Sequence, residues 1–341
     1  MVNELHATSA AWLAGHSSTA CDWPVAAVAH AVRTGGLTVA VVLPALNEEA
    51  TVGKIVATIV NELLLPGGSA LAGVDPDAGR FVSEVVVVDS GSTDDTARVA
   101  TAAGARVVSK RDVLPGVTPL PGKGDSMWRG LAATTSDVVV FIDADLQSFS
   151  ADYVTGLVGP LAANPMLQLV KAVYERPLVA GETVVPAGGG RVTELLARPL
   201  INRFWPELAA VVQPLAGEYA GRRALLESLP FPCGYGVELA LMVDTYERHG
   251  LAALAQVDLG VRVHRHHDDQ GLGVMAAEIL DTALRRVPGL ATRAGARADA
   301  DAPTLTQFER TAHGYQSQAR ALSTIERPPL RDVLGPVPAQ R

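Results

Sequence analysis

Two aspartates, one residue apart, follow an apolar run in FIDADLQSF (141–149). In an extended segment, Asp143 and Asp145 point to the same side, because side chains at i and i+2 share a face. Two like charges held together repel unless a positive charge lies beside them. A divalent cation such as Mg²⁺ or Mn²⁺, completed by a ligand diphosphate, would supply that charge. The simpler alternative is a strand that ends in two water-exposed carboxylates.

A basic cluster, HRHH (264–267), directly follows the strand-like run QVDLGVRV. It is either a solvated turn or part of the metal site, because imidazole is a good ligand for transition metals such as Mn²⁺. His264 is nearest to the strand and is therefore the predicted ligand.

Two glycine-containing segments are candidates for anion binding. PGKGD (121–125) places Lys123 at a predicted helix start, and such starts favour phosphate. AGGGRVT (187–193) places Arg191 beside glycine backbone, where a guanidinium can hold a carboxylate or phosphate with two hydrogen bonds. The alternative for each segment is an ordinary loop with a solvated basic side chain.

Glu238 lies in the otherwise apolar helical stretch CGYGVELALM (233–242). A carboxylate that faces an apolar core is costly unless it has a partner. Glu238 is therefore either an acid/base or substrate-orienting group or a glutamate on the helix surface.

The composition limits the class of protein. The chain has 341 residues, 48% hydrophobic and 19% charged, with a formal net charge of -8. This supports one large domain, or one domain with an extension, and argues against a general nucleic-acid or anionic-membrane surface. The two cysteines are too few for a disulfide framework. The first 20 residues show no signal-peptide pattern and no apolar run has the length of a membrane span, so we expect a cytoplasmic protein.

Strand-like and helix-like segments alternate from residue 37 to 146 with short connections, which predicts an α/β fold with a parallel, doubly wound sheet. The expected strands are 37–46, 83–92, 105–110, 137–146 and 167–174, and the expected helices are 48–65, 93–104 and 123–134. The loops LPALNEE, VDSGSTDD and DADLQS follow three of these strands. We expect them at the carboxyl edge of the sheet, where such folds bind ligands.

Together these motifs resemble the nucleotide-sugar glycosyltransferases of the A-type fold, and more narrowly the actinobacterial glucosyl-3-phosphoglycerate synthases. The matching segments cover most of residues 38–308 and include VVLPALNEE, VVDSGSTDDT, PGKGDSMWRGLAA, VVVFIDADL, GGGRVTELLARPL, QPLAGEYA, LPFPCGYGVELALMVDT and AQVDLGVRVHR. The resemblance implies a Rossmann-like sheet with helices on both faces and a C-terminal acceptor-binding part. It also implies a cytoplasmic homodimer that transfers glucose, with retention, from UDP-glucose to the 2-hydroxyl of 3-phosphoglycerate with Mg²⁺ or Mn²⁺.

The resemblance also implies roles for individual residues. The donor would be bound by Pro44, Ala45, Leu46, Asn47, Glu48, Ser90, Lys123, Asp143, Ala144, Tyr235 and Arg262, and the acceptor by Gly190, Arg191, Val192, Thr193 and His266. Asp145 and His264 would hold the metal, and the catalytic candidates are Asp145, Glu238 and Leu215. Leu215 would offer its backbone carbonyl near the attacking hydroxyl, and Glu238 would orient glucose or acceptor. Attack on the leaving-group face and a covalent intermediate both stay open.

The sequence divides into four parts, and the roles of the second and third are what the resemblance implies. Residues 1–36 are an irregular extension with a short helix near 23–32, and residues 37–175 are the nucleotide-sugar-binding part. Residues 176–287 are the acceptor-binding and catalytic part. Residues 288–341 are a loosely ordered tail and a candidate for dimer contacts.

Three other functions match parts of the pattern. A transferase with a GDP-sugar or mannosyl donor, or with another small anionic or lipid-phosphate acceptor, would have the same fold. The lipid-phosphate acceptor is disfavoured because no membrane segment is predicted. A sugar-phosphate nucleotidyltransferase normally has a glycine-rich, arginine-bearing loop after its first strand, which LPALNEE is not. A non-enzymatic binder would not explain why acidic, basic and histidine candidates occur together.

Overall fold

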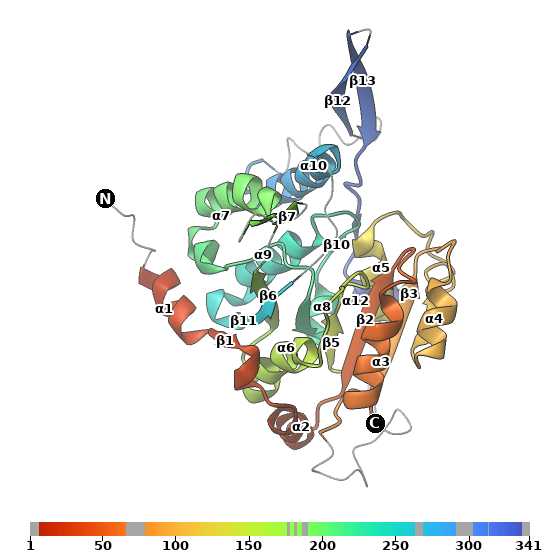
Figure 1. Cartoon of the computed structure of the whole chain (residues 1–341). Helices are drawn as coiled ribbons and strands as arrows, with labels where there is room; N and C mark the ends of the chain where they lie inside the picture. The colour runs from red at the N-terminus through yellow and green to blue at the C-terminus, as the bar shows by residue number, and fades with distance from the viewer. Residues whose placement is uncertain are drawn as a thin grey trace.

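The computed structural model describes residues 7–65, 79–175, 178–180, 183–185, 190–262, 269–290, 303–312 and 314–335. Eight strands form one sheet in the order β1-β11-β6-β9-β5-β2-β3-β4 (Figure 1). They are β1 (Ser17–Thr19), β2 (Val39–Ala45), β3 (Glu84–Asp89), β4 (Arg106–Ser109), β5 (Val138–Phe141), β6 (Leu169–Glu175), β9 (Tyr219–Arg222) and β11 (Leu254–Val261). All neighbours pair in parallel except β9, which is antiparallel to β5 and β6. The expected α/β fold with a mostly parallel sheet is confirmed.

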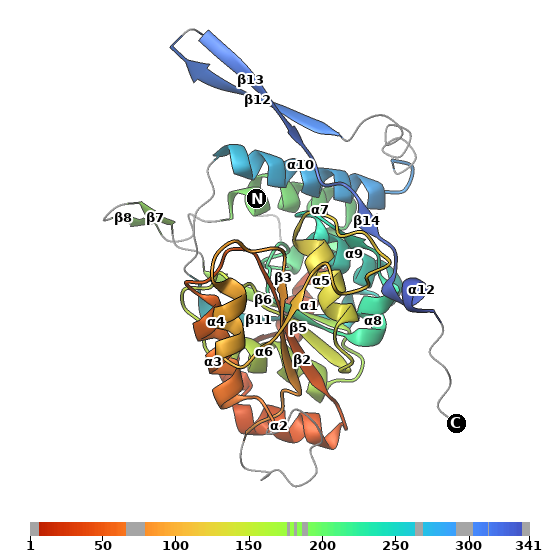
Figure 2. The same ribbon diagram turned by 90° about the vertical axis from the view of Figure 1, so that its right-hand side faces the viewer.

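Helices cover both faces of this sheet (Figures 1 and 2). They are α1 (Ala7–Gly15), α2 (Val25–Thr34), α3 (Val52–Glu62), α4 (Thr96–Ala102), α5 (Lys123–Ala132), α6 (Asp152–Ala163), α7 (Arg198–Phe204), α8 (Arg223–Ser228), α9 (Val237–His249), α10 (Asp269–Arg286) and α12 (Leu330–Leu334). Short helical segments are η1 (Ala20–Asp22), η3 (Thr193–Ala197), η4 (Pro206–Ala210) and η5 (Leu251–Ala253). The remaining strands are β7 (Leu178–Ala180), β8 (Thr183–Val185), β10 (Phe231–Pro232), β12 (Thr304–Thr311), β13 (Gly314–Ala321) and β14 (Glu326–Arg327).

Each face of the sheet has its own hydrophobic cluster, because successive side chains of a strand point to opposite faces. In β2, Val41 and Leu43 pack on one face and Val42 on the other. Residues of α2, α3, α4 and α6 join the first cluster, and residues of α5, α8 and α9 join the second. Burial on both faces explains why the central strands read as continuous apolar runs in the sequence.

The N-terminal segment belongs to the main fold. Trp12 of α1 is buried and donates its indole N–H to the carbonyl of Leu254 at 3.0 Å. β1 extends the sheet by pairing in parallel with β11. The helix expected near residues 23–32 is α2, but the expectation of an otherwise irregular start was wrong. The partner that fixes this segment, β11, lies far away in the sequence.

The described part of residues 288–341 also forms regular structure, so the expected loosely ordered tail was wrong there. β12 and β13 form a hairpin that projects from the body of the molecule (Figure 2). β14 pairs with β10, and Arg327 of β14 donates to Asp125 of α5 at 2.5 Å. Leu330 of α12 is fully buried. The C-terminal segment is therefore attached to the helix that begins with Lys123.

The topology brings several loops to one edge of the sheet. The parallel strands β2, β3, β5, β6 and β11 all end at this edge, and β9 begins there because it runs the opposite way. The sheet contains strands that precede residue 175 in the chain and also β9 and β11, which follow it. The predicted division of the chain at residue 175 therefore does not separate two sheets, and it stays a prediction about function. Among the described helices, none combines the length and the apolar character that a membrane crossing requires.

Candidate active site

Six charged side chains gather at the carboxyl edge of the sheet, linked by ion pairs. This ionic cluster consists of Lys123 at the start of α5, Asp143 and Asp145 after β5, Glu218 before β9, Glu238 in the first turn of α9 and Arg262 after β11. Five of these residues were predicted as site residues from the sequence. The structure brings them together although they come from distant parts of the chain.

Asp143 is held between the two cations of the cluster. Its Oδ1 atom forms an ion pair with Lys123, and its Oδ2 atom accepts a hydrogen bond from Nη2 of Arg262 at 2.9 Å. Burial alone would raise the pKa of Asp143, but Lys123 and Arg262 lower it well below its usual range. Asp143 is therefore ionised and has a cationic partner on each oxygen.

Asp145 has a different environment. Its side chain is 34% exposed, and its contact with Nη2 of Arg262 is long, at 3.4 Å. Burial and the neighbouring charge of Asp143 raise its pKa, because both disfavour a second negative charge. Asp145 is thus the aspartate with carboxylate oxygen left for a ligand, in agreement with its predicted role.

Lys123 lies between Asp143 and Glu238, and its Nζ donates to Oε1 of Glu238 at 2.9 Å. Burial alone would lower the pKa of Lys123, but the surrounding carboxylates raise it well above its usual value. Gly217 lies against this ion pair, and a Cβ atom there would collide with the Asp143 carboxylate and lie 2.7 Å from Nζ of Lys123. Any side chain at position 217 would therefore displace Asp143 or Lys123.

The glycine before Lys123 is also needed. Gly122 caps α5 with a φ of 103°, a left-handed conformation that favours glycine. A Cβ atom at Gly122 would overlap the carbonyl of Cys233, and the N–H of Gly124 donates to the same carbonyl at 2.9 Å. The start of α5 is thus fixed against the segment that leads to Tyr235 and Glu238.

Arg262 connects the aspartates to a buried group behind them. Its Nη1 atom donates to Oε2 of Glu218 at 3.0 Å and to the hydroxyl of Tyr174 at 2.7 Å. That hydroxyl donates to the same Glu218 oxygen at 2.7 Å. Burial alone would lower the pKa of Arg262, but Glu218, Tyr174 and the aspartates raise it. The sequence analysis did not identify Glu218 or Tyr174; the carboxylate in the apolar segment LAGEYAG was the available signal.

Two loops carry residues predicted to bind the uridine of the donor, one after β2 and one after β3, and they lie side by side. Asn47 has a φ of 58°, its N–H donates to Oγ of Ser92 at 3.0 Å, and its side-chain oxygen accepts from the N–H of Thr93 at 2.8 Å. The hydroxyl of Ser90 is hydrogen-bonded to that of Ser126 in α5 at 2.8 Å. Pro44 and Ala45 end β2, Leu46 is exposed and Glu48 follows in the same loop. Their contact with a uridine stays a prediction.

The segment that contains Leu215 is fixed at several points. Gln213 donates through its side chain to the carbonyl of Tyr174, and Nζ of Lys171 donates to the carbonyl of Ala216 at 3.0 Å. The carbonyl of Glu218 accepts from the N–H of Ala172 at 3.1 Å. The backbone around Leu215 is therefore rigidly placed beside the ionic cluster. Ala144 is buried, and its carbonyl accepts from Oγ1 of Thr51 at 2.6 Å.

Four of the predicted acceptor residues lie directly before η3 or at its first position: Gly190, Arg191, Val192 and Thr193. Gly190 has a φ of 84°, and its carbonyl accepts from the N–H of Glu194 at 3.0 Å. Arg191 is exposed, whereas Val192 and Thr193 are mostly buried. His264 and His266 lie outside the described residues, so their roles stay predictions. Tyr235 is 40% exposed, and its N–H donates to Glu278 of α10 at 2.9 Å.

The ionic cluster fits a divalent cation. Counted as ionised, it holds four carboxylates and two cations, so one divalent cation would balance its charge. Carboxylate oxygen is a ligand that Mg²⁺ and Mn²⁺ prefer, and Asp145 offers it. The described residues alone contain no group of three or more His, Cys, Asp or Glu side chains that could hold a metal. The site therefore needs further ligands, for which a bound diphosphate and His264 are the predicted sources.

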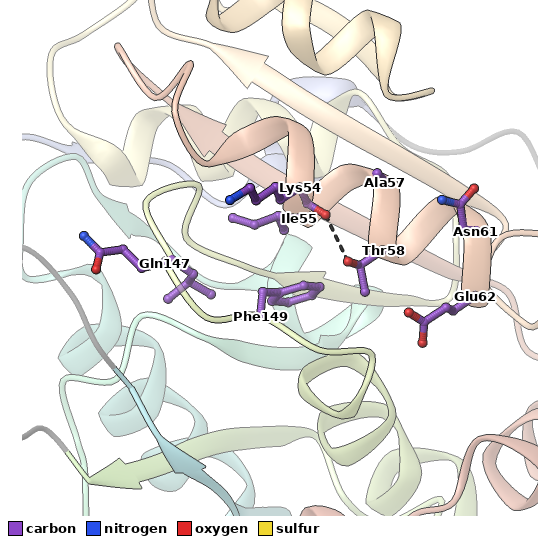
Figure 3. Close-up of a pocket in the computed structure, with 9 residues that line it drawn as sticks. Lys54, Ile55, Ala57, Thr58, Asn61, Glu62, Gln147 and Phe149 are labelled. Atoms are coloured by element: carbon purple, nitrogen blue, oxygen red, sulfur yellow. Dashed lines mark hydrogen bonds between the residues drawn. The ribbon is translucent and has the colours of Figure 1, made fainter.

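A separate cavity of about 440 Å³ lies along α3 (Figure 3). It is lined by Lys54, Ile55, Ala57, Thr58, Asn61, Glu62, Leu146, Gln147 and Phe149. The last three of these residues follow Asp145 in the chain, but the lining contains no member of the ionic cluster. We therefore do not assign a substrate to this cavity.

Known proteins are similar to most of this chain. Residues 40–196 match the family model of glycosyl transferase family 2. The glucosyl-3-phosphoglycerate synthase of Mycolicibacterium smegmatis is 45% identical over 319 residues, which cover 94% of this chain and 97% of that protein.

Two crystal structures of the Mycobacterium tuberculosis glucosyl-3-phosphoglycerate synthase are also similar. The complex with Mg²⁺ and UDP has a TM-score of 0.77 at 42% identity, covering 94% of this chain and 99% of that one. The complex with Mn²⁺, UDP-glucose and phosphoglyceric acid has a TM-score of 0.73 at 43% identity, covering 91% and 95%. This chain is a glycosyltransferase and belongs to the family of glucosyl-3-phosphoglycerate synthases.

Proposed function

We propose that this chain transfers glucose from UDP-glucose to the 2-hydroxyl of 3-phosphoglycerate, with retention of the anomeric configuration and with Mg²⁺ or Mn²⁺. The observation that carries the proposal is the ionic cluster, in which Asp143 is saturated by two cations while Asp145 is left open. Relatives that have been crystallised with UDP-glucose, phosphoglyceric acid and Mn²⁺ support the choice of substrates. The cytoplasm remains the expected location.

The donor side of the site uses the chain's own charges. Asp145 would hold the cation, with His264 as the predicted second protein ligand, and the bound cation would balance the charge that develops on the departing diphosphate. Lys123 adds a fixed positive charge at the start of α5, where a phosphate is also favoured. Asp143 keeps Lys123 and Arg262 in place.

The acceptor part of the site has to bind both the phosphate and the carboxylate of 3-phosphoglycerate. Arg191 can bind phosphate or carboxylate with two hydrogen bonds, and Gly190 and Thr193 lie next to it in the chain. Such a grip would place the acceptor hydroxyl beside the anomeric carbon, which is a proximity effect. The rigid carbonyl of Leu215 would orient that hydroxyl.

The surroundings of Glu238 favour a role in orienting the substrate over a role as a nucleophile. It is 7% exposed, and its Oε1 atom accepts from Lys123 at 2.9 Å. A carboxylate held in an ion pair is a weaker nucleophile than a free one. Glu238 is therefore proposed to orient glucose, with Lys123 fixing its position.

The decisive assay incubates the purified chain with UDP-glucose and 3-phosphoglycerate in Mg²⁺, in Mn²⁺ and in EDTA. We expect metal-dependent release of UDP and a new glucoside whose anomeric proton shows the α configuration by NMR. Parallel reactions replace the donor by GDP-glucose and the acceptor by glycerate or glycerol 3-phosphate. Product with GDP-glucose only, a β-glucoside, or full turnover in EDTA would each refute one part of the proposal.

We also propose that the chain forms a homodimer through the β12–β13 hairpin. Phe308 faces Ser317 across the hairpin and Arg310 faces Tyr315, so both aromatic rings lie on the same face. They are 67% and 75% exposed. A two-stranded hairpin is marginally stable on its own, and an exposed aromatic face gives a second copy of the chain a surface to cover.

The test of the dimer is light scattering after gel filtration. The chain should elute with twice the mass of one copy, and Phe308→Ser combined with Tyr315→Ser should convert it to a monomer. The matched control replaces Glu309 and Gln316 by serine, because this opposed pair lies on the other face of the hairpin. A monomeric parent chain, or a double aromatic variant that stays dimeric, would contradict the proposal.

A further inference from the structure

Glu218 is a fully buried member of the ionic cluster and lies directly before β9. Its Oε2 atom accepts two hydrogen bonds, from Nη1 of Arg262 and from the hydroxyl of Tyr174. Burial and the charge of Asp143 raise the pKa of Glu218, whereas Arg262 and the hydrogen bond from Tyr174 lower it. A buried carboxylate is costly and therefore calls for a functional explanation.

Arg262 divides its hydrogen bonds between two sides. Its Nη1 atom points to Glu218 and Tyr174, whereas its Nη2 atom reaches Asp143 at 2.9 Å and Asp145 at 3.4 Å. The guanidinium group is planar, so the bonds on Nη1 also determine where Nη2 lies. Glu218 thus acts on the two aspartates although it touches neither through a hydrogen bond.

The charge of Glu218 decides how strongly Arg262 competes for Asp145. Without that charge, the guanidinium would keep a surplus of positive charge beside the two aspartates. It would then repel an incoming cation and attract the Asp145 oxygen that the cation needs. Glu218 compensates the surplus through Nη1 of Arg262, the nitrogen that does not contact the two aspartates.

We propose that Glu218 is a positioning residue that holds Arg262 away from Asp145 and so keeps Asp145 available to the divalent cation. Tyr174 assists by fixing the same guanidinium nitrogen. The inference rests on the proposed cation site at Asp145, but not on the identity of the acceptor. It can therefore be tested without any transfer of glucose.

The experiment measures the affinity of the full chain for Mn²⁺ in the presence of UDP, by electron paramagnetic resonance of the free ion. Glu218→Gln keeps the shape of the side chain and removes its charge. Because partners behind a metal ligand typically control metal affinity, we expect binding about 10- to 100-fold weaker than in the parent chain. At saturating Mn²⁺, the KM for 3-phosphoglycerate should stay unchanged.

A matched control separates this role from simple loss of a buried ion pair. Asp244 pairs with Arg286 at 2.8 Å through both oxygens, away from the ionic cluster. Asp244→Asn should lower the melting temperature and leave the Mn²⁺ affinity unchanged. Tyr174→Phe keeps all charges of the site but removes the hydroxyl that accepts from Arg262 and donates to Glu218, and we expect it to weaken Mn²⁺ binding about threefold or more.

The outcomes are distinct. A folded Glu218→Gln variant that binds Mn²⁺ like the parent chain overturns the inference. If that variant does not fold, unchanged Mn²⁺ affinity in Tyr174→Phe overturns it. If the parent chain makes no glucoside but its Mn²⁺ affinity depends on Glu218, the proposed function fails and the inference stands.

Discussion

Asp143 and Asp145 lie one residue apart and share Arg262, but only Asp143 also forms an ion pair with Lys123 among the described contacts. Asp143 is bound by Lys123 on one oxygen and by Arg262 on the other, whereas Asp145 makes a long contact with Arg262 and has a side chain that is 34% exposed. Burial alone would raise the pKa of Asp143, but the two cations lower it further than burial raises it. The pKa of Asp145 is raised by burial and by the charge of Asp143. Asp143 thus organises the site and Asp145 is left for a ligand.

Alanine at the two aspartates should therefore give different defects. Asp145→Ala should reduce kcat/KM about 10³-fold, because a bound cation contributes several kcal/mol to the transition state. It should not lower the melting temperature, since it removes a like charge. Asp143→Ala should lower both kcat/KM and the melting temperature, because Lys123 and Arg262 lose a shared partner. UDP release and thermal unfolding measure the two effects, and normal turnover of Asp145→Ala would refute the assignment of the metal ligand.

Gly217→Ala should disturb the ionic cluster without changing any of its charges. The added Cβ atom would collide with the Asp143 carboxylate and displace Nζ of Lys123. We expect kcat/KM to fall about 10- to 100-fold through misplacement of these groups. Gly116→Ala is the matched control, because no heavy atom lies within 4 Å of its added Cβ. Equal activity of both variants would show that the close packing at Gly217 is unimportant.

Much of the site could be predicted because its residues follow strands. Asp143 and Asp145 come directly after an apolar run, and the carboxyl ends of parallel strands share one edge. Arg262 was predicted only from the family resemblance. The periodic pattern also predicted β2 to β6 and α3 to α5. The strand expected over 137–146 was too long, because β5 ends at Phe141 and Asp143 and Asp145 lie in the loop and turn that follow it. The local sequence is sufficient for such elements because burial on both faces determines their composition.

Glu218 could not be found in this way because its position depends on β9. This strand is four residues long, contains Gly221 and runs antiparallel between β5 and β6. No local pattern indicates that a short segment is inserted between two parallel strands. The N-terminal strand β1 was missed for the same reason, since pairing with β11 and not its own sequence defines it.

Arg191→Ala should act mainly on the acceptor. If Arg191 holds the phosphate or carboxylate of 3-phosphoglycerate, its loss removes charged hydrogen bonds, and the acceptor KM should rise about 10- to 100-fold. The KM for UDP-glucose should stay nearly constant. Arg203→Ala is the control, because this arginine lies in the last turn of α7 in the same part of the chain. An unchanged acceptor KM in Arg191→Ala would refute the predicted acceptor pocket.

Asp125 should make the stability of the fold depend on pH. It is fully buried in α5 and contacts Lys110 and Arg129 at 3.2 Å and Arg327 at 2.5 Å. Burial alone would raise its pKa, but Arg327 and Lys110 lower it below the ordinary value of 3.8. The folded state therefore favours the ionised carboxyl, which stabilises the chain above that value and loses its effect as the pH falls through the folded-state pKa.

Asp125→Asn tests this linkage by urea unfolding. At pH 7 the variant should be less stable than the parent chain by about 3 kcal/mol, because three buried cations lose their shared carboxylate. The difference should shrink as the pH falls below 3.8 and through the lowered folded-state pKa of Asp125, because the parent carboxyl then becomes protonated as well. Asp332→Asn, an exposed site in the same C-terminal segment, should change stability by less than about 0.5 kcal/mol at either pH. A difference for Asp125→Asn that is constant or grows on acidification would mean that the buried carboxyl is not what attaches β14 to α5.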